Sequence, residues 1–98
     1  MVRQFVILKA MLQLPPAETP LNRHSLIALE TWLKELGAER SKIDACKWEW
    51  MMPQWSAEIQ IEVDELRVTW DKDGYRNQCC FPYGLPRADV EIAIKQGP

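Results

Sequence analysis

Apolar residues recur at three- and four-residue spacing between residues 25 and 36, with charged side chains on the opposite side. This spacing predicts an amphipathic helix whose apolar face packs against a core. Asn22 or Ser25 can cap its first turn, and Gly37 can adopt the left-handed conformation that commonly ends a helix. The predicted core face consists of Leu26, Leu29, Trp32, Leu33 and Leu36.

From residue 46 onward the apolar period changes to two, which predicts strands with one buried face. The first strand, residues 46–50, ends before Pro53, and the second spans residues 56–63. A tight connection at Asp64-Glu65 places every apolar residue of the second and third strands on one face. The facing pairs are then Val63–Leu66, Ile61–Val68 and Ile59–Trp70. Because Asp-Glu is not a preferred hairpin pair, a longer loop is the alternative.

The last part of the chain predicts one more strand and a second helix. Asp73-Gly74 can adopt positive φ and favours a tight turn into a strand from Tyr75 to Phe81. Pro86 suits the first turn of a helix that runs to about Gln96. We expect the inner face of this strand to carry Tyr75, Asn77, Cys79 and Phe81, and the helix to bury Val90, Ala93 and Ile94.

The predicted order is helix, four antiparallel strands, helix. It indicates an α+β fold, a two-layer sandwich in which both helices lie on one face of a four-stranded meander. Pro15, Pro16 and Pro20 disfavour regular structure at the beginning of the chain. We therefore expect residues 1–20 to form an N-terminal arm and residues 21–98 to form a single domain.

Length and charge narrow the classes of partner. The 98 residues, of which 47% are hydrophobic and 27% charged, fit one globular domain. A net charge of -2 gives little attraction to phosphate backbones or anionic lipid, so nucleic acid is not an expected partner. The uncharged run near the start, Gln4 to Leu8, is far shorter than the roughly 20 residues that cross a bilayer. No transmembrane segment is predicted.

The chain contains no catalytic motif, and we predict neither enzymatic activity nor a cofactor. His24 could serve as a general base with Ser25 as nucleophile, but nothing in the sequence fixes that geometry. Neighbouring Cys79 and Cys80 point to opposite faces of a strand and so do not share a metal site. With Cys46 the chain has three cysteines, and an odd number cannot all form disulfides within one chain, which favours reduced thiols. We expect at least one of them to be a small buried hydrophobic residue.

Five tryptophans are the most unusual feature of the composition. Trp32 and Trp70 fall on predicted core faces, whereas the other three crowd one hairpin, and a two-layer domain has a single inner face to receive them. Exposed tryptophan beside methionine is typical of protein contacts. The predicted contact residues are Trp48, Trp50, Met51, Met52 and Trp55 in the hairpin, and Tyr83 and Arg87 in the loop that precedes the last helix.

Two alternatives are open for Arg87, which stands in the first turn of the last helix, where the helix dipole disfavours a positive charge. It either pairs within the chain with Asp44 or Glu49, or contacts another protein. The order of elements is similar to that of double-stranded RNA-binding domains. Their last helix begins with several lysines, whereas here Arg87 is followed by Asp89 and Glu91, which make a poor phosphate clamp.

Several segments resemble a small protein family found in cyanobacteria and plastids. These are Thr19-Pro20-Leu21, the helix segment Leu29-Glu30-Thr31-Trp32-Leu33, Trp55-Ser56-Ala57-Glu58, Phe81-Pro82-Tyr83 and Arg87-Ala88-Asp89-Val90-Glu91. The resemblance extends over about residues 19–98, and the family is a domain of unknown function. It implies a photosynthetic lineage and a cytoplasmic or plastid-stromal setting, and it implies no catalytic residues.

Together these features predict a non-enzymatic protein-interaction module that serves as an assembly or accessory factor for a photosynthetic complex. One alternative is a small metal- or ligand-binding, enzyme-like domain built around His24 and the cysteines. A further alternative is an RNA-binding domain. The two edges of the predicted sheet also allow a homodimer, in which one edge strand pairs with a second copy.

Overall fold

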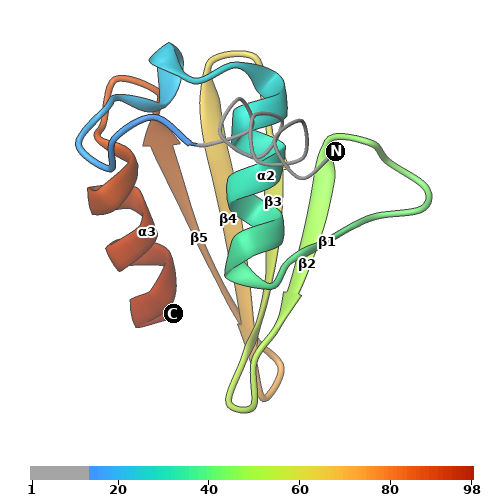
Figure 1. Ribbon diagram of the computed structural model, residues 1–98. Helices are drawn as coiled ribbons and strands as arrows, with labels where there is room; N and C mark the ends of the chain where they lie inside the picture. The colour runs from blue at the N-terminus through green and yellow to red at the C-terminus, as the bar shows by residue number, and fades with distance from the viewer. Residues whose placement is uncertain (1–13) are drawn as a thin grey trace, which may run out of the picture.

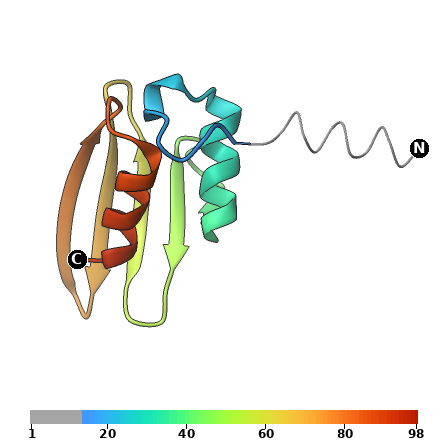
Figure 2. The same cartoon turned by 60° about the vertical axis from the view of Figure 1, so that its left-hand side comes forward.

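A five-stranded antiparallel sheet carries two helices on one face (Figure 1; Figure 2). The computed structural model describes residues 14–98. The elements are η1 (Leu21–Arg23), α2 (Leu26–Leu36), β1 (Glu39–Arg40), β2 (Lys47–Met51), β3 (Ser56–Ile61), β4 (Glu65–Lys72), β5 (Tyr75–Pro82) and α3 (Arg87–Gln96). The predicted α+β sandwich is confirmed, with one more strand than expected. The additional strand, β1, has two residues and is too short to show an alternating pattern in the sequence.

The strands follow one another in the sheet in chain order, β1-β2-β3-β4-β5. Both helices pack against the same face, and their apolar sides meet the inward-facing residues of β2 to β5. The fully buried side chains include Leu21, Trp32, Leu33, Trp48, Ile59, Leu66, Val68, Val90 and Ile94. The first thirteen residues of the predicted arm lie outside the described residues. No helix among residues 14–98 is long and apolar enough to cross a membrane.

The helix ends agree with the capping residues read from the sequence. The Ser25 side chain accepts a hydrogen bond from the backbone N–H of Ala28 at 3.0 Å, and Gly37 adopts a φ of 106° after the last turn of α2. Leu26, however, was wrongly expected in the core and is 60% exposed. The first turn of α2 stands at the end of the sheet, where Leu26 lines a surface hollow instead of meeting strand side chains.

The hairpin between β3 and β4 is longer than the predicted tight connection. Ile61 faces Leu66 and Ile59 faces Val68, a register two residues away from the expected one. The backbone N–H of Glu62 donates to the carbonyl of Glu65 at 3.0 Å and closes this longer loop. Because side chains alternate with a period of two, the shift preserves the buried face. Val63 leaves the strand and is 94% exposed.

The turn into β5 is confirmed, because Asp73 and Gly74 both adopt positive φ. The expected burial of β5 is largely wrong. Phe81 is buried opposite Leu66, but the six residues from Tyr75 to Cys80 are exposed. β5 is the outermost strand, so the helices cover only the end that carries Phe81. All three cysteines are exposed as well, which contradicts the expectation that at least one is buried.

Candidate functional site

Two of the tryptophans predicted to contact a partner belong to the core. Trp48 is 0% exposed and Trp50 is 4% exposed, so neither ring can form a docking surface in the folded chain. Small neighbours make room for Trp50. Trp50 pairs across the sheet with Ala57, and its indole lies beside Gly37, where an added Cβ would come within 3.4 Å of the ring nitrogen. The prediction for these two residues is therefore wrong.

The rest of the hairpin offers only a small apolar surface. Trp55 is half-buried and meets Trp50 edge to face, with ring centroids 5.5 Å apart and an interplanar angle of 87°. The other side of its ring lies against Gly97. Met51 is 76% exposed and Met52 is 37% exposed. The contact surface predicted for this hairpin is thus reduced to two methionines and part of one indole ring.

The loop before α3 is held by the segment that precedes α2. The backbone N–H groups of Leu21 and Asn22 donate to the carbonyls of Leu85 and Tyr83 at 3.0 and 2.8 Å. Further along, Ala88 N–H donates to the carbonyl of Ala17 at 2.8 Å. We call this antiparallel pairing of residues 17–22 with residues 83–88 the clasp. Part of the sequence that we expected to be an arm is therefore bonded to the domain.

Arg87 forms neither of the predicted ion pairs. Its Nη2 donates to the carbonyl of Pro15 at 3.1 Å, and among the described residues it has no salt bridge with Asp44 or Glu49. Burial opposes ionisation of Glu91, one turn further along α3, but hydrogen bonds from Trp32 and Lys95 lower its pKa, with smaller contributions from the charges of Lys95 and Arg87. The guanidinium therefore fixes the clasp and is only partly available to another molecule.

The start of α2, η1, the β3–β4 loop and the loop that contains Tyr83 lie at the upper end of Figure 1. Side chains from these segments line a shallow, open hollow. Its volume is about 220 Å³. The walls are predominantly apolar, with a histidine, an asparagine and a glutamate between them. The lining residues are Leu21, Asn22, His24, Leu26, Leu29, Ile61, Glu62 and Tyr83.

His24 is the most informative residue of the hollow, because it is 8% exposed and its imidazole ring makes a single hydrogen bond among the described residues. Its Nδ1 lies 3.0 Å from the carbonyl oxygen of Pro20. A carbonyl only accepts, so Nδ1 carries the hydrogen, and in the neutral ring Nε2 is an acceptor. Nε2 is buried and has no hydrogen-bond partner among the described residues. Buried polar atoms are normally bonded, so a lone acceptor here calls for an explanation.

Tyr83 forms the opposite wall and is fixed by the β3–β4 loop. Its hydroxyl donates to the backbone carbonyl of Glu62. Burial, followed by the nearby negative charge of Glu62, raises the pKa of Tyr83, so its phenol stays neutral and keeps donating. The rim of the hollow is apolar and exposed. Leu26 lines the hollow, and Ile27 and Val63, which follow the lining residues Leu26 and Glu62 in the sequence, are 63% and 94% exposed.

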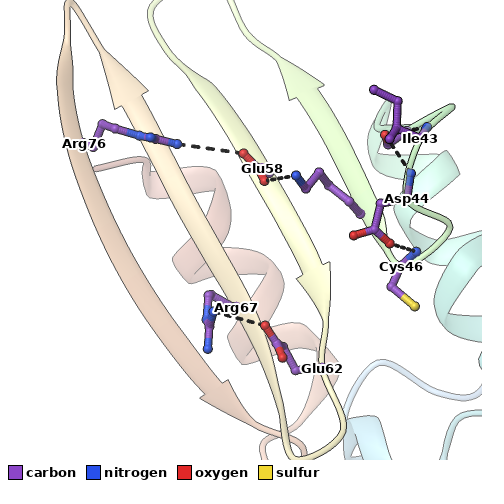
Figure 3. A network of polar contacts seen from close by, with 9 residues as sticks. Ile43, Asp44, Cys46, Glu58, Glu62, Arg67 and Arg76 are labelled. Carbon is purple, nitrogen blue, oxygen red and sulfur yellow. Dashed lines mark hydrogen bonds and ion pairs between the residues drawn. The ribbon is translucent and has the colours of Figure 1, made fainter.

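The outer face of the sheet carries paired charges. Glu58 contacts Lys47 at 2.9 Å and Arg76 at 3.9 Å, and Arg67 contacts Glu62 at 3.1 Å (Figure 3). The hydrogen bond and charge of Glu58 raise the pKa of Lys47. Each of these cations already has a carboxylate neighbour, which weakens its attraction for a phosphate.

The residues considered for catalysis or metal binding are not brought together. The Ser25 hydroxyl caps α2, and Cys79 and Cys80 occupy successive, opposite-facing positions of β5. Within residues 14–98, no three His, Cys, Asp or Glu side chains are grouped as a metal site requires. Sequence reasoning singled out His24 and Tyr83 separately but missed the hollow that they share. One signal for the hollow was present in the sequence. Leu21, which lines it, is an apolar residue that directly follows Pro20 and lies outside the periodic apolar pattern of α2.

The comparisons with known proteins identify a family and nothing more specific. A family model described as "Protein of unknown function (DUF3143)" matches residues 36–97. A search of the curated proteins and a search of the solved structures each gave no match. The matched stretch includes the sheet, α3 and the hollow residues Ile61, Glu62 and Tyr83, whereas the remaining lining residues precede it.

Proposed function

We propose that this chain, which belongs to the DUF3143 family of proteins of unknown function, is a non-enzymatic protein-interaction module whose contact surface is the hollow around His24. One observation carries the proposal: an open apolar hollow is lined by His24, whose ring has a buried hydrogen-bond acceptor with no partner within residues 14–98. Leaving such an atom unpaired costs about 1–3 kcal/mol. A partner that supplies a donor and an apolar group recovers this cost on binding.

The size and chemistry of the hollow favour a protein side chain as the occupant. Pockets for small-molecule ligands usually have volumes of about 300–1,000 Å³, whereas this one has about 220 Å³ and is open to solvent. Its apolar walls suit one aliphatic or aromatic side chain. The Nε2 atom of His24 suits a backbone N–H or a hydroxyl group of the same partner segment. The exposed apolar rim then extends the contact beyond the hollow.

The biological setting is a further part of the proposal. We place the module in the cytoplasm or plastid stroma of a photosynthetic organism, as an assembly or accessory factor for a photosynthetic complex. This part rests on the resemblance of the Thr19-Pro20-Leu21 and Phe81-Pro82-Tyr83 segments to cyanobacterial and plastid sequences. The two methionines of the β2–β3 hairpin provide a second, smaller surface at the opposite end of the molecule.

Matched charge substitutions at the two ends test where the partner binds. Leu26→Glu places a carboxylate on the rim, and an acidic residue in the first turn of a helix is compatible with the helix dipole. Met51→Glu places the same charge at the other end. A partner captured by the wild-type chain should bind Leu26→Glu about tenfold or more weakly, because an apolar contact worth over 1 kcal/mol is lost.

Binding is measured by titration of the purified partner with each folded variant. Weakening by Leu26→Glu with retention by Met51→Glu supports the hollow as the contact surface. The reverse pattern places the contact at the hairpin and refutes the proposal. Equal binding of both variants refutes it as well, since neither apolar end then takes part.

A further inference from the structure

β5 is an unprotected edge strand. It ends the sheet, spans eight residues and pairs with β4 along its whole length without a bulge. The opposite edge, β1, has only two residues. Edge strands are usually protected by shortness, charged side chains, prolines or bulges, but β5 has one charged residue, Arg76, and its only proline is its last residue, Pro82. Its residues from Tyr75 to Cys80 are exposed, and no described strand pairs with its outer side.

The register identifies the free backbone groups. Lys72 and Tyr75 flank the two-residue Asp73-Gly74 turn, and such a pair exchanges both of its backbone hydrogen bonds. Hydrogen-bonded and non-hydrogen-bonded pairs alternate along an antiparallel ladder. The N–H and C=O groups of the remaining set therefore point away from β4, toward solvent. This set is Arg76, Gln78 and Cys80.

We propose that β5 pairs with β5 of a second copy of this chain, antiparallel and centred on Gln78, so that two sheets join into one. A two-fold axis at Gln78 lets all three outward-facing residues of each copy exchange hydrogen bonds with the other copy. The uncharged Gln78 meets itself, so no like charges oppose each other at the centre. Sheet extension of this kind is a common mode of strand recognition.

Two further pairs of residues face each other in this register. Tyr75, which is 83% exposed, comes opposite Phe81 of the second copy, and aromatic pairs across strands are favourable. Arg76 comes opposite Cys80 of the second copy. The Cys80 thiol has both Glu65 and Arg67 as neighbours, so the incoming guanidinium meets a carboxylate and a cation together. Parallel pairing would instead bring Arg76 beside Arg76.

Proline at position 78 is the sharpest perturbation of this interface. Because the N–H of Gln78 points away from β4, a proline there removes an outward donor without breaking the β4–β5 ladder. Gln78→Thr keeps the N–H and is the matched control. In sedimentation equilibrium of the full chain under reducing conditions, we expect a dimer for the wild type and for Gln78→Thr. Gln78→Pro should raise the dissociation constant about tenfold or more, since two interchain hydrogen bonds are lost.

A disulfide trap checks the register independently of the proline variant. Asn77 and Cys79 of the second copy form a closely spaced non-hydrogen-bonded pair in the proposed arrangement, which suits a disulfide. Asn77→Cys, in a chain with Cys46 and Cys80 replaced by serine, should give a covalent dimer on diamide oxidation. The same chain with Cys79→Ser should not.

Several results would overturn the proposal. They are a wild-type monomer at every concentration, a dimer that Gln78→Pro leaves intact, and a trap that fails in a dimeric sample. Hydrogen exchange adds a fourth: a protected Gln78 amide in a monomer shows that another part of the same chain covers β5. If Gln78→Pro does not fold, the trap and the exchange measurement decide the question alone.

Discussion

The hydrogen bond between Trp32 and Glu91 joins the two helices and provides a quantitative test of how the fold is held together. Trp32 is 1% exposed, and its Nε1 donates to Glu91 Oε1 at 2.7 Å. The same carboxylate accepts a bond from Lys95 at 3.2 Å, one turn further along α3. Glu91→Ala removes both bonds, whereas Lys95→Ala removes only the second.

The expected magnitudes differ between the two variants. A hydrogen bond to a charged group contributes about 1.5–3 kcal/mol, and an exposed ion pair at this spacing about 0.3–0.5 kcal/mol. Because one third of the Glu91 side chain is exposed, water can partly replace the lost acceptor. We therefore expect Glu91→Ala to lower the free energy of unfolding by about 2 kcal/mol, and Lys95→Ala by about 0.5 kcal/mol or less.

Urea denaturation followed by tryptophan fluorescence measures both effects, and a double-mutant cycle isolates the bond of interest. In a Trp32→Phe background the indole N–H is absent, so Glu91→Ala should cost only the small Lys95 contribution. The cycle should give a coupling free energy of about 1.5 kcal/mol. A coupling below about 0.5 kcal/mol would show that the buried indole gains no stability from Glu91, and the argument would fail.

The pH dependence follows from the lowered pKa of Glu91. A carboxyl group whose pKa is lower in the folded state stabilises the fold fully above its unfolded value, here 4.5, and the stabilisation is lost as the pH falls through the folded value. The difference in stability between the wild type and Glu91→Gln should therefore be constant near pH 7 and shrink in acid. A difference that grows as the pH falls below 4.5 would contradict this assignment.

Two further predictions concern Gly97 and Cys80. Gly97→Ala should destabilise the fold by about 1–2 kcal/mol, because Gly97 has a φ of 81° and an added Cβ would lie 2.6 Å from the Trp55 ring nitrogen. Thermal melts measure this loss and should show none for the control Gly84→Ala, whose Cβ meets no atom within 4 Å. Because a side-chain hydrogen bond with Glu65 raises the pKa of the exposed Cys80 thiol, Glu65→Gln should speed its alkylation at neutral pH. Mass spectrometry of the alkylated peptides measures that rate, and an unchanged rate would contradict the stated cause.

The features that the sequence predicts correctly are local. A side-chain cap at Ser25 and a left-handed residue at Gly37 act within one helical turn, so their roles follow from neighbouring residues. The Asp73-Gly74 turn is equally local. The alternating face of β3 was also predicted correctly for Ala57 and Ile59, since a two-residue error in register leaves the face unchanged.

The features that the sequence does not predict depend on residues far apart in the chain. The burial of Trp50 requires space beside its ring, and small residues from other elements, Gly37 and Ala57, provide it. A count of aromatic residues on one strand cannot reveal that space. The hollow is similar, because its walls come from four separate segments, and only the fold brings His24 beside Tyr83.

The clasp has a consequence for how the protein is made. It joins residues 17–22 to residues 83–88, and its Arg87–Pro15 bond links positions 72 residues apart. Contacts of such long sequence separation form late, because the intervening chain must first be ordered. While the chain is being synthesised, residues 17–22 therefore lack their backbone partners in the clasp until the start of α3 has emerged from the ribosome. Its final register is set only after translation has passed the last strand.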